Sequence, residues 1–192
     1  FIIFYILKFM SFVFKKLSIP EVILVEPKLY SDNRGFFFES FKEEDFFSIG
    51  ITKMIQDNFS HSIYGVVRGL HYQKNPKAQA KLVTVFDGKI FDVAVDIRKN
   101  SPTYGKWVSE ILSCENHKSL YIPEGFAHGF CVLSKEADVL YKVSNEYSLE
   151  NEGGIIWNDP TINIPWSVEK PIISEKDSQL PLLENSENDF TY

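Results

Sequence analysis

Short apolar runs alternate with turn residues along most of the chain. Between Val22 and Trp157 these runs are rich in Val, Ile, Phe and Tyr, and Gly, Pro, Asn and Asp lie between them. Short strands with frequent turn signals are typical of β-sandwiches and β-barrels. The pattern therefore predicts an all-β fold.

The clearest turn signal is Asp87-Gly88, in the segment KLVTVFDGKIFDVAVDIR. This dipeptide suits the two positive-φ positions of a tight turn, so the segment predicts a β-hairpin. Beyond the turn, apolar residues at 91, 93, 95 and 97 alternate with Asp92, Ala94, Asp96 and Arg98. The apolar side is predicted to be core, and the opposite side faces either solvent or a polar cavity.

The main predicted helix covers FKEEDFFSIG, residues 41–50. Its early acidic residues suit the positive end of the helix dipole, and Gly50 is a suitable stop. After the turn signal Asn158-Asp159-Pro160, periodicity is weak and prolines recur. This last segment is predicted to wrap around the barrel as coil and short helix.

Length and composition indicate one globular domain. The chain has 192 residues, 44% of them hydrophobic, with no internal repeat or linker, so we predict a single domain over residues 10–192. The first nine residues are apolar, but they are too few to span a bilayer and lack the features of a signal peptide. We interpret residues 1–9 as a start-site artefact or a disordered extension.

Charge and cysteine usage narrow the classes of partner. The net charge of -6 and the absence of a Lys/Arg cluster argue against nucleic-acid binding. Cys114 and Cys131 lack CxxC spacing, which disfavours a disulfide framework or a thiolate zinc site and suits the reducing cytoplasm. Only three arginines occur, at 34, 68 and 98. They either bind phosphate or carboxylate with their planar fork, or pair with surface acids.

The segment GVVRGLHYQ places Arg68, His71 and Gln73 on one predicted strand. By strand alternation His71 and Gln73 project to the same side, and Arg68 projects to the other side unless Gly69 permits a bulge. A lone histidine on a strand is more often structural than catalytic, so its neighbours must decide its role.

The segment YIPEGFAHGF carries a tight Pro-Gly turn that delivers His128 at the start of a strand, and it resembles the second motif of cupins. In metal-binding cupins the first motif supplies two histidines and a glutamate, which here fall on His71, Gln73 and either Lys77 or Ala78. Two histidines are fewer than the three protein ligands of a usual catalytic metal site. We therefore expect no metal and no other cofactor.

Nine phrases in order carry a wider resemblance: DNRGFFFES, IQDNFS, GVVRGLHYQ, AQAKLV, GKIFDVAVDIRKNSPTYGKW, YIPEGFAHGF, LYKVSNEYS, IIWNDP and ISEKD. From about Ile19 to Leu183 the chain resembles the dTDP-4-dehydrorhamnose 3,5-epimerase family. The resemblance implies a cupin jelly-roll barrel with a few short peripheral helices. It also implies a cytoplasmic homodimeric isomerase of dTDP-L-rhamnose biosynthesis, which binds no nucleic acid and no membrane. The reaction would convert dTDP-4-dehydro-6-deoxy-D-glucose to dTDP-4-dehydro-L-rhamnose.

The chemistry of that family suits the residue types. A 4-keto sugar has acidified hydrogens on carbons 3 and 5, so inversion needs a base on one face, an acid on the other, and stabilisation of the enolate. The resemblance makes His71 the base, Asp177 its orienting partner and Tyr141 the acid. Lys81 would stabilise negative charge at the carbonyl oxygen.

The resemblance also implies a set of substrate-binding residues. Arg34 and Arg68 would bind the pyrophosphate, Glu39, Gln56 and Asn58 the thymidine, and His128, Glu152 and Lys176 would complete the pocket. The family often carries a pair of tyrosines where this chain has Glu146-Tyr147, which leaves open whether an aromatic ring stacks there on the base or the sugar.

Each of these residues also has a structural reading. Tyr141 could be a core aromatic residue, Glu39 and Lys176 solvated, and Asp177 a helix cap. Asp92 and Asp96 could simply be exposed, and His61 and His117 match no catalytic phrase, so we assign them to surface or turn roles.

Three other functions remain as alternatives. A related cupin could invert only carbon 3 or isomerise the ketone, and a non-catalytic cupin could bind a sugar nucleotide. The presence of a base and an acid disfavours the non-catalytic reading. A metal dioxygenase is disfavoured by the ligand count.

Overall fold

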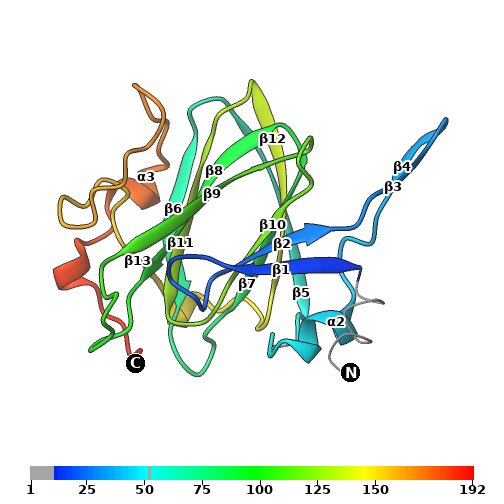
Figure 1. Ribbon diagram of the computed structural model, residues 1–192. Coiled ribbons are helices and arrows are strands. Elements are labelled where there is room, and N and C mark those ends of the chain that lie inside the picture. Colours follow the sequence, from blue (N-terminus) through cyan, green and yellow to red (C-terminus); the bar gives the residue numbers. More distant parts are fainter. Residues whose placement is uncertain (1–10, 52) are drawn as a thin grey trace.

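The computed structural model describes residues 11–51 and 53–192, so the predicted extension at residues 1–9 lies outside the described residues. Two antiparallel sheets face each other and form a barrel (Figure 1), which confirms the all-β prediction. The six-stranded sheet has the order β1 (Phe12–Lys16), β2 (Ile23–Pro27), β10 (Ser119–Ile122), β7 (Lys81–Asp87), β12 (Glu136–Val143) and β5 (Gln56–Ile63). The five-stranded sheet has the order β13 (Glu152–Gly154), β6 (Val67–Gln73), β11 (Phe126–Val132), β8 (Lys89–Asp96) and β9 (Trp107–Ser113).

The predicted hairpin around Asp87-Gly88 is wrong in its pairing, although the turn is where the sequence places it. Strand β7 pairs with β10 and β12, whereas β8 pairs with β11 and β9. The turn therefore carries the chain from one sheet to the other. Gly88 has a φ of 77°, and a Cβ at this position would overlap the carbonyl oxygen of Glu136, so the crossing requires glycine.

The main core lies between the two sheets. Val83 and Leu120 from the six-stranded sheet pack there with Ile90 and Phe130 from the five-stranded sheet. A second cluster covers the outer side of the five-stranded sheet, where residues 93, 95 and 97 pack against the C-terminal segment through residues such as Ile162. Strand β8 is therefore buried on both sides, which positions its polar alternate residues inside the barrel.

The reading of Asp92 and Asp96 as exposed is wrong, because both are 0% exposed. Asp96 accepts hydrogen bonds from Arg98, Ser101 and Thr103 and stabilises the turn that follows β8. Asp92 lies on the side of the polar cavity described below, where it is hydrogen-bonded to the lining residue His128. Of the two sequence alternatives for this side of the strand, the cavity is the correct one for Asp92.

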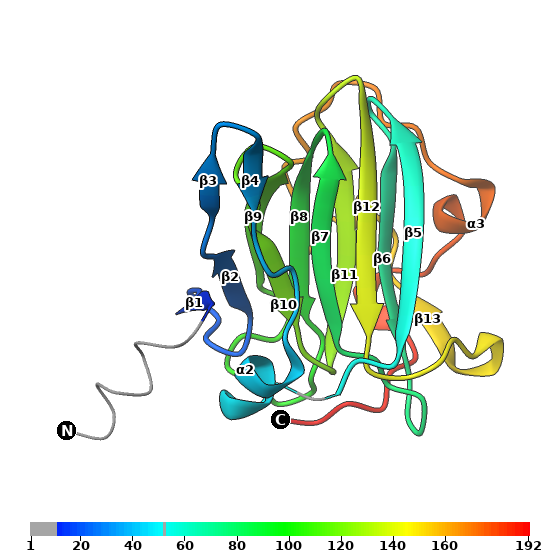
Figure 2. The ribbon, with the colours of Figure 1, turned by 90° about the vertical axis from the view of Figure 1, so that its right-hand side faces the viewer.

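Short helices lie outside the barrel, on two different sides (Figure 2). The predicted helix at 41–50 appears as α2 (Glu43–Ser48), whose Phe46 packs edge-on against Phe12 and Phe14. Helix α3 (Glu175–Ser178) lies on the side of the five-stranded sheet, next to β6. Two 3-10 turns, Leu149–Asn151 and Leu183–Asn185, complete the helical elements of the described residues.

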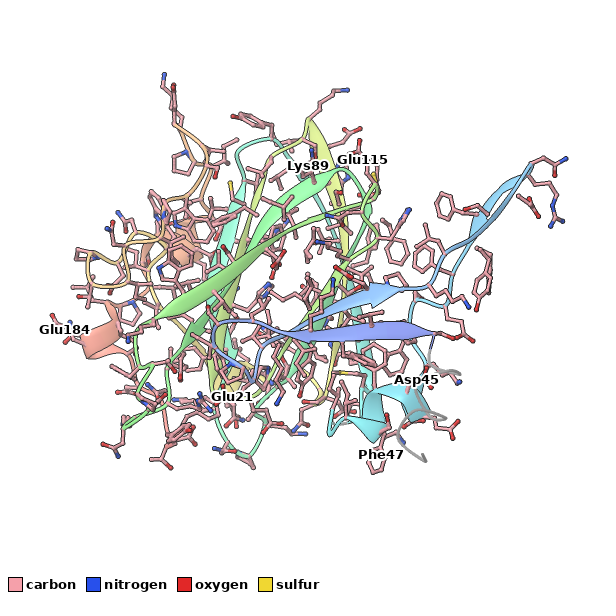
Figure 3. All side chains as sticks on the ribbon, in the orientation of Figure 1. Glu21, Asp45, Phe47, Lys89, Glu115 and Glu184 are labelled. Atoms are coloured by element: carbon pink, nitrogen blue, oxygen red, sulfur yellow. The ribbon has the colours of Figure 1, made fainter. Side chains whose placement is uncertain are left out.

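A two-stranded arm, β3 (Tyr30–Asp32) and β4 (Gly35–Phe37), projects away from the barrel (Figure 1). Its side chains extend beyond the body of the protein, as does Phe47 on α2 (Figure 3). Tyr30, Phe36 and Phe37 are all exposed. Over the described ranges, no helix is long and apolar enough to cross a membrane.

Candidate active site

A cavity of about 270 Å³ opens between the two sheets. Its lining comes from β5, β6, β7, β11, β12 and β13 and from the segments that lead to β7 and β13. The lining residues are Asn58, Arg68, His71, Tyr72, Gln73, Gln79, Lys81, His128, Phe130, Tyr141, Tyr147 and Glu152. Seven of the residues predicted to form the site are therefore brought together here: Asn58, Arg68, His71, Lys81, His128, Tyr141 and Glu152.

A bulge in β6 explains how Arg68 and His71 reach the same cavity. His71 pairs with His128 and Arg68 pairs with Phe130, so three steps along β6 match two steps along β11. The bulge includes Gly69, whose φ is 121°. A Cβ at Gly69 would lie 2.6 Å from the Cα of Gly129, so no other residue fits without moving β11.

His71 and Asp177 form a hydrogen-bonded pair at the cavity. The His71 Nε2–H donates to Asp177 Oδ1 at 2.8 Å, and the Gly69 amide donates to Asp177 Oδ2 at 3.2 Å. Burial acts to raise the pKa of the Asp177 carboxyl, but the hydrogen bond and charge of His71, with the Gly69 and Ser174 contacts, lower it below its usual range. An ionised Asp177 fixes the imidazole tautomer and leaves Nδ1 available to accept a proton.

Asp177 is also held by its own helix. The Ser174 side chain caps α3 by accepting a hydrogen bond from the Asp177 amide at 3.0 Å. The reading of Asp177 as a cap residue is wrong in this sense, since Ser174 takes that role. The ISEKD phrase therefore contains both Ser174, which caps the helix, and Asp177, whose carboxylate the capped helix positions.

Tyr141 enters the cavity from the other sheet. It lies on β12, where it pairs with Asn58 of β5 and Val83 of β7. Burial raises the pKa of its hydroxyl, and the charge of Arg68 offsets part of this effect. The hydroxyl is therefore protonated at neutral pH and available as a proton donor.

Lys81 lies inside the cavity at the start of β7 and is 8% exposed. Its Nζ donates to the backbone carbonyl of His71 at 3.2 Å. Burial lowers the pKa of the ammonium to about 8, against the charges of Asp92 and Glu152, which raise it. A desolvated cation at this place would stabilise a developing oxyanion strongly.

His128 forms a second buried pair with Asp92. The His128 Nε2–H donates to Asp92 Oδ2 at 2.9 Å, and both side chains are nearly inaccessible to solvent. Burial lowers the pKa of His128, and Asp92 counteracts this in part. The pair presents a ring of fixed orientation to the cavity.

The far end of the cavity carries amides and an aromatic ring. Gln56 Nε2 donates to Asn58 Oδ1 at 2.8 Å, and Gln56 Oε1 accepts from the Tyr147 amide at 3.1 Å. Gln56 itself therefore contacts two lining residues.

Arg68 Nε donates to the Ser62 hydroxyl at 3.0 Å, which directs the guanidinium along the edge of β5.

Lys176 and Asp177 line an adjoining hollow of about 420 Å³, which shares Arg68 and His71 with the cavity. Lys176 Nζ contacts Glu152 Oε2 at 2.6 Å, and the Tyr147 hydroxyl donates to the same oxygen at 3.0 Å. Burial acts to raise the pKa of Glu152, but these two hydrogen bonds lower it below its usual range. Glu152 thus joins α3 to the rim of the cavity.

Two other predicted residues, Arg34 and Glu39, line neither the cavity nor the adjoining hollow. Arg34 is at the tip of the β3–β4 arm, where it pairs with Asp32 at 2.6 Å and its side chain is 85% exposed. Glu39 lies between β4 and α2 and is not among the lining residues. Among the described residues of one copy, no hydrogen bond or ion pair joins either residue to the other site residues.

Tyr72, Gln79, Phe130 and Asp92 had no site role predicted from the sequence, and the role of Tyr147 was left open. A signal existed for some of them, because Gln79 lies inside the AQAKLV phrase and Asp92 alternates with core residues. His61 and His117 are peripheral as predicted: His61 pairs with Asp138 on the surface, and His117 occupies a turn with a φ of 54°.

No group of three or more His, Cys, Asp or Glu side chains that could hold a metal occurs at 11–51 or 53–192. Gln73 occupies the position of a histidine ligand in metal cupins, and its amide is committed to the backbone: Nε2 donates to the carbonyls of Lys77 and Glu146 at 2.7 and 3.1 Å.

Comparison with known proteins assigns the family. A family model described as dTDP-4-dehydrorhamnose 3,5-epimerase matches residues 16–185. The dTDP-4-dehydrorhamnose 3,5-epimerase of Shigella flexneri is 56% identical over 164 residues, which cover 84% of this chain and 91% of that protein. A crystal structure of dTDP-6-deoxy-D-glucose-3,5-epimerase from Legionella pneumophila, in complex with dTDP-4-keto-L-rhamnose, superposes with a TM-score of 0.88 at 47% identity, covering 91% of this chain and 94% of that chain.

A more distant structure represents the alternative that inverts a single carbon. The 3'-monoepimerase of Streptomyces bikiniensis, in complex with dTDP-quinovose, gives a TM-score of 0.83 at 32% identity, covering 88% of this chain and 87% of that chain. The 3,5-epimerases are more similar on both measures. The fold is the cupin jelly roll of these enzymes, and the chain belongs to the dTDP-4-dehydrorhamnose 3,5-epimerase family.

Proposed function

We propose that this protein converts dTDP-4-dehydro-6-deoxy-D-glucose to dTDP-4-dehydro-L-rhamnose by inverting carbons 3 and 5, a step of dTDP-L-rhamnose biosynthesis. One observation carries the proposal. A histidine paired with a buried carboxylate and a protonated tyrosine line one cavity from opposite sheets. This is the arrangement that inversion through an enolate requires.

In the proposed mechanism, His71 removes the proton next to the ketone through Nδ1, since Nε2 is bonded to Asp177. The electron pair of the broken C–H bond moves into the enolate, and the ketone oxygen becomes negatively charged. Lys81 stabilises this oxygen, and Asp177 stabilises the imidazolium that forms.

Tyr141 then protonates the same carbon from the opposite face, which inverts its configuration. After this step His71 is an imidazolium and Tyr141 is a phenolate. His71 releases its proton to solvent and Tyr141 takes up a proton from solvent, which restores the enzyme for the second carbon. Arg68 and Lys176 supply positive charge near the cavity and the adjoining hollow, where they would bind the pyrophosphate of an anionic substrate. Gln56 and Asn58 supply hydrogen-bonding groups for the thymidine, and His128 and Glu152 complete the pocket.

The test is turnover of dTDP-4-keto-6-deoxyglucose by the purified protein in deuterated water, followed by NMR. We expect deuterium at carbons 3 and 5 and the L-rhamno configuration in the product. Inversion and exchange at carbon 3 alone would assign the protein to the monoepimerases. A shifted ketone would indicate a ketoisomerase, and binding without exchange would indicate a non-catalytic cupin.

We also propose a homodimer, formed through the outer side of the six-stranded sheet. Phe59, Ile63, Leu140 and Phe86 project from that side by strand alternation, and three of them are exposed: Phe59, Ile63 and Phe86. An apolar sheet face of this kind needs a cover, and the exposed aromatic arm of a second copy is a suitable one. Light scattering should give twice the mass of the chain. Phe59→Glu should yield monomer, whereas Ile111→Glu, on β9 of the other sheet, should not.

The dimer would also explain the position of Arg34, which lies outside the cavity of its own copy. We propose that the arm places Arg34 in the partner's site. Mixing Arg34→Ala with His71→Asn subunits tests this, because each hybrid dimer would regain one complete site. Hybrid activity no greater than that of the separate variants would contradict the proposal.

A cytoplasmic location is proposed on the free thiols of Cys114 and Cys131, which suit a reducing compartment. Cell fractionation that recovers the protein with cytoplasmic markers would support it, and recovery with an oxidising compartment would contradict it.

A further inference from the structure

The side chain of Gln73 has no free hydrogen-bonding group, although it lines the cavity. Its Nε2 donates to the carbonyls of Lys77 and Glu146 at 2.7 and 3.1 Å, and its Oε1 accepts from the Ser148 amide at 2.7 Å. The residue is 3% exposed. Because both N–H groups and the oxygen are engaged with backbone atoms, Gln73 has little left to offer a substrate.

Two of the three backbone groups that Gln73 binds, those of Glu146 and Ser148, flank Tyr147 in the segment we call the 144–148 loop. The Tyr147 amide is bonded to Gln56, and the Tyr147 hydroxyl is bonded to Glu152. Tyr147 is 56% exposed and lines the cavity. Its ring therefore stands at the rim, and the buried side chain of Gln73 holds the backbone on either side of it.

We infer that Gln73 is a positioning residue, which fixes the 144–148 loop so that Tyr147 stands at the rim of the cavity for the nucleotide-sugar. The inference rests on the proposed function, because it takes a dTDP-sugar as the ligand. Only an amide can supply two donors and one acceptor to three backbone groups at once. An ionised glutamate would accept from Ser148 but repel the two carbonyl oxygens, and a neutral imidazole has a single donor.

The position thus differs in function from its counterpart in metal-binding cupins. Where those proteins use a histidine to hold an ion, this chain uses Gln73 to hold a loop. The glutamine at position 73 therefore has two effects: it is a poor metal ligand, and it holds the loop that carries Tyr147.

The test is a double-mutant cycle on Gln73→Leu and Tyr147→Ala, read by the Kd for dTDP and by kcat and KM separately. Gln73→Leu removes the hydrogen-bond partner of three backbone groups and frees the loop, so we expect the Kd and KM to rise roughly tenfold. The kcat should change far less, because the His71–Asp177 pair is untouched. If Gln73 acts through Tyr147, the double variant should bind no more weakly than the weaker single variant.

The outcomes separate this inference from the proposed function. If the wild-type protein neither binds dTDP nor exchanges deuterium, the proposed function fails first. If wild type is active and Gln73→Leu binds dTDP equally well, or the two effects multiply, Gln73 does not position Tyr147. Gln179→Leu makes the same chemical change at an exposed position and should leave the Kd unaltered.

Gln73→Glu provides a second test if the leucine variant is poorly folded. Its carboxylate cannot donate at neutral pH, so dTDP should bind weakly. Protonation toward about pH 5 restores one donor and should recover part of the affinity relative to wild type at the same pH. An affinity deficit that stays constant over this pH range would overturn the role of donation by Gln73.

Discussion

Lys81 should reduce the stability of the protein while contributing to its activity. Burial lowers the pKa of its ammonium from 10.5 to about 8. At pH 7 this corresponds to a cost on the order of 3 kcal/mol for keeping the charge in the folded protein. Lys81→Met removes the charge and keeps most of the volume, but it also loses the hydrogen bond to the His71 carbonyl, worth about 1 kcal/mol. The variant should therefore be more stable than wild type by about 2 kcal/mol.

The sign of the pH dependence follows from the two states. The folded protein releases the Lys81 proton near pH 8, whereas the unfolded chain keeps it until near pH 10.5. Between these values the unfolded state binds more protons, so the stability of wild type rises with pH. The advantage of Lys81→Met should be greatest below pH 8 and should disappear toward pH 10.5.

Urea denaturation of both proteins from pH 7 to pH 10 measures this difference. In parallel, kcat/KM of wild type should fall as the pH rises through about 8, because the ammonium that stabilises the enolate is lost. Lys81→Met should be slower by roughly a hundredfold to a thousandfold and should lack this alkaline decline. A variant less stable than wild type at pH 7, or a difference independent of pH, would refute the reasoning.

Three further predictions concern the roles of the other groups. His71→Asn should abolish both epimerisation and deuterium exchange, whereas Tyr141→Phe should retain some exchange without inversion; inverted product from Tyr141→Phe at the wild-type rate would contradict the assignment. Asp177→Asn should lower kcat roughly tenfold to a hundredfold, since it loses a charge-assisted hydrogen bond, and a wild-type rate would remove Asp177 from the mechanism. Chelator treatment should leave activity unchanged, and activity that returns only with added iron, zinc or manganese would disprove the prediction that no metal takes part.

The sequence by itself determined the local elements and the family, and it named part of the cavity lining. Alternating apolar residues produced the strands, and Gly50 and Asp87-Gly88 marked a helix end and a turn that the structure contains. The ordered phrases assigned the family, and seven residues predicted from them line one cavity. These features depend on nearest neighbours in the chain or on motifs with fixed spacing, and both are visible in one dimension.

Only the tertiary structure decided which strands pair and where the polar side chains point. The turn at Asp87-Gly88 looks the same whether its strands pair or separate, and long-range partners send β7 and β8 to different sheets. Strict alternation places Arg68 and His71 on opposite sides of the strand. The pairing of β6 with β11 shows the bulge at Gly69 that brings them to the same side. The sequence left Asp92 facing either solvent or a polar cavity, and it is buried because both sides of β8 are covered. Each of these outcomes depends on contacts between residues far apart in the chain, and local sequence patterns carry no record of such contacts.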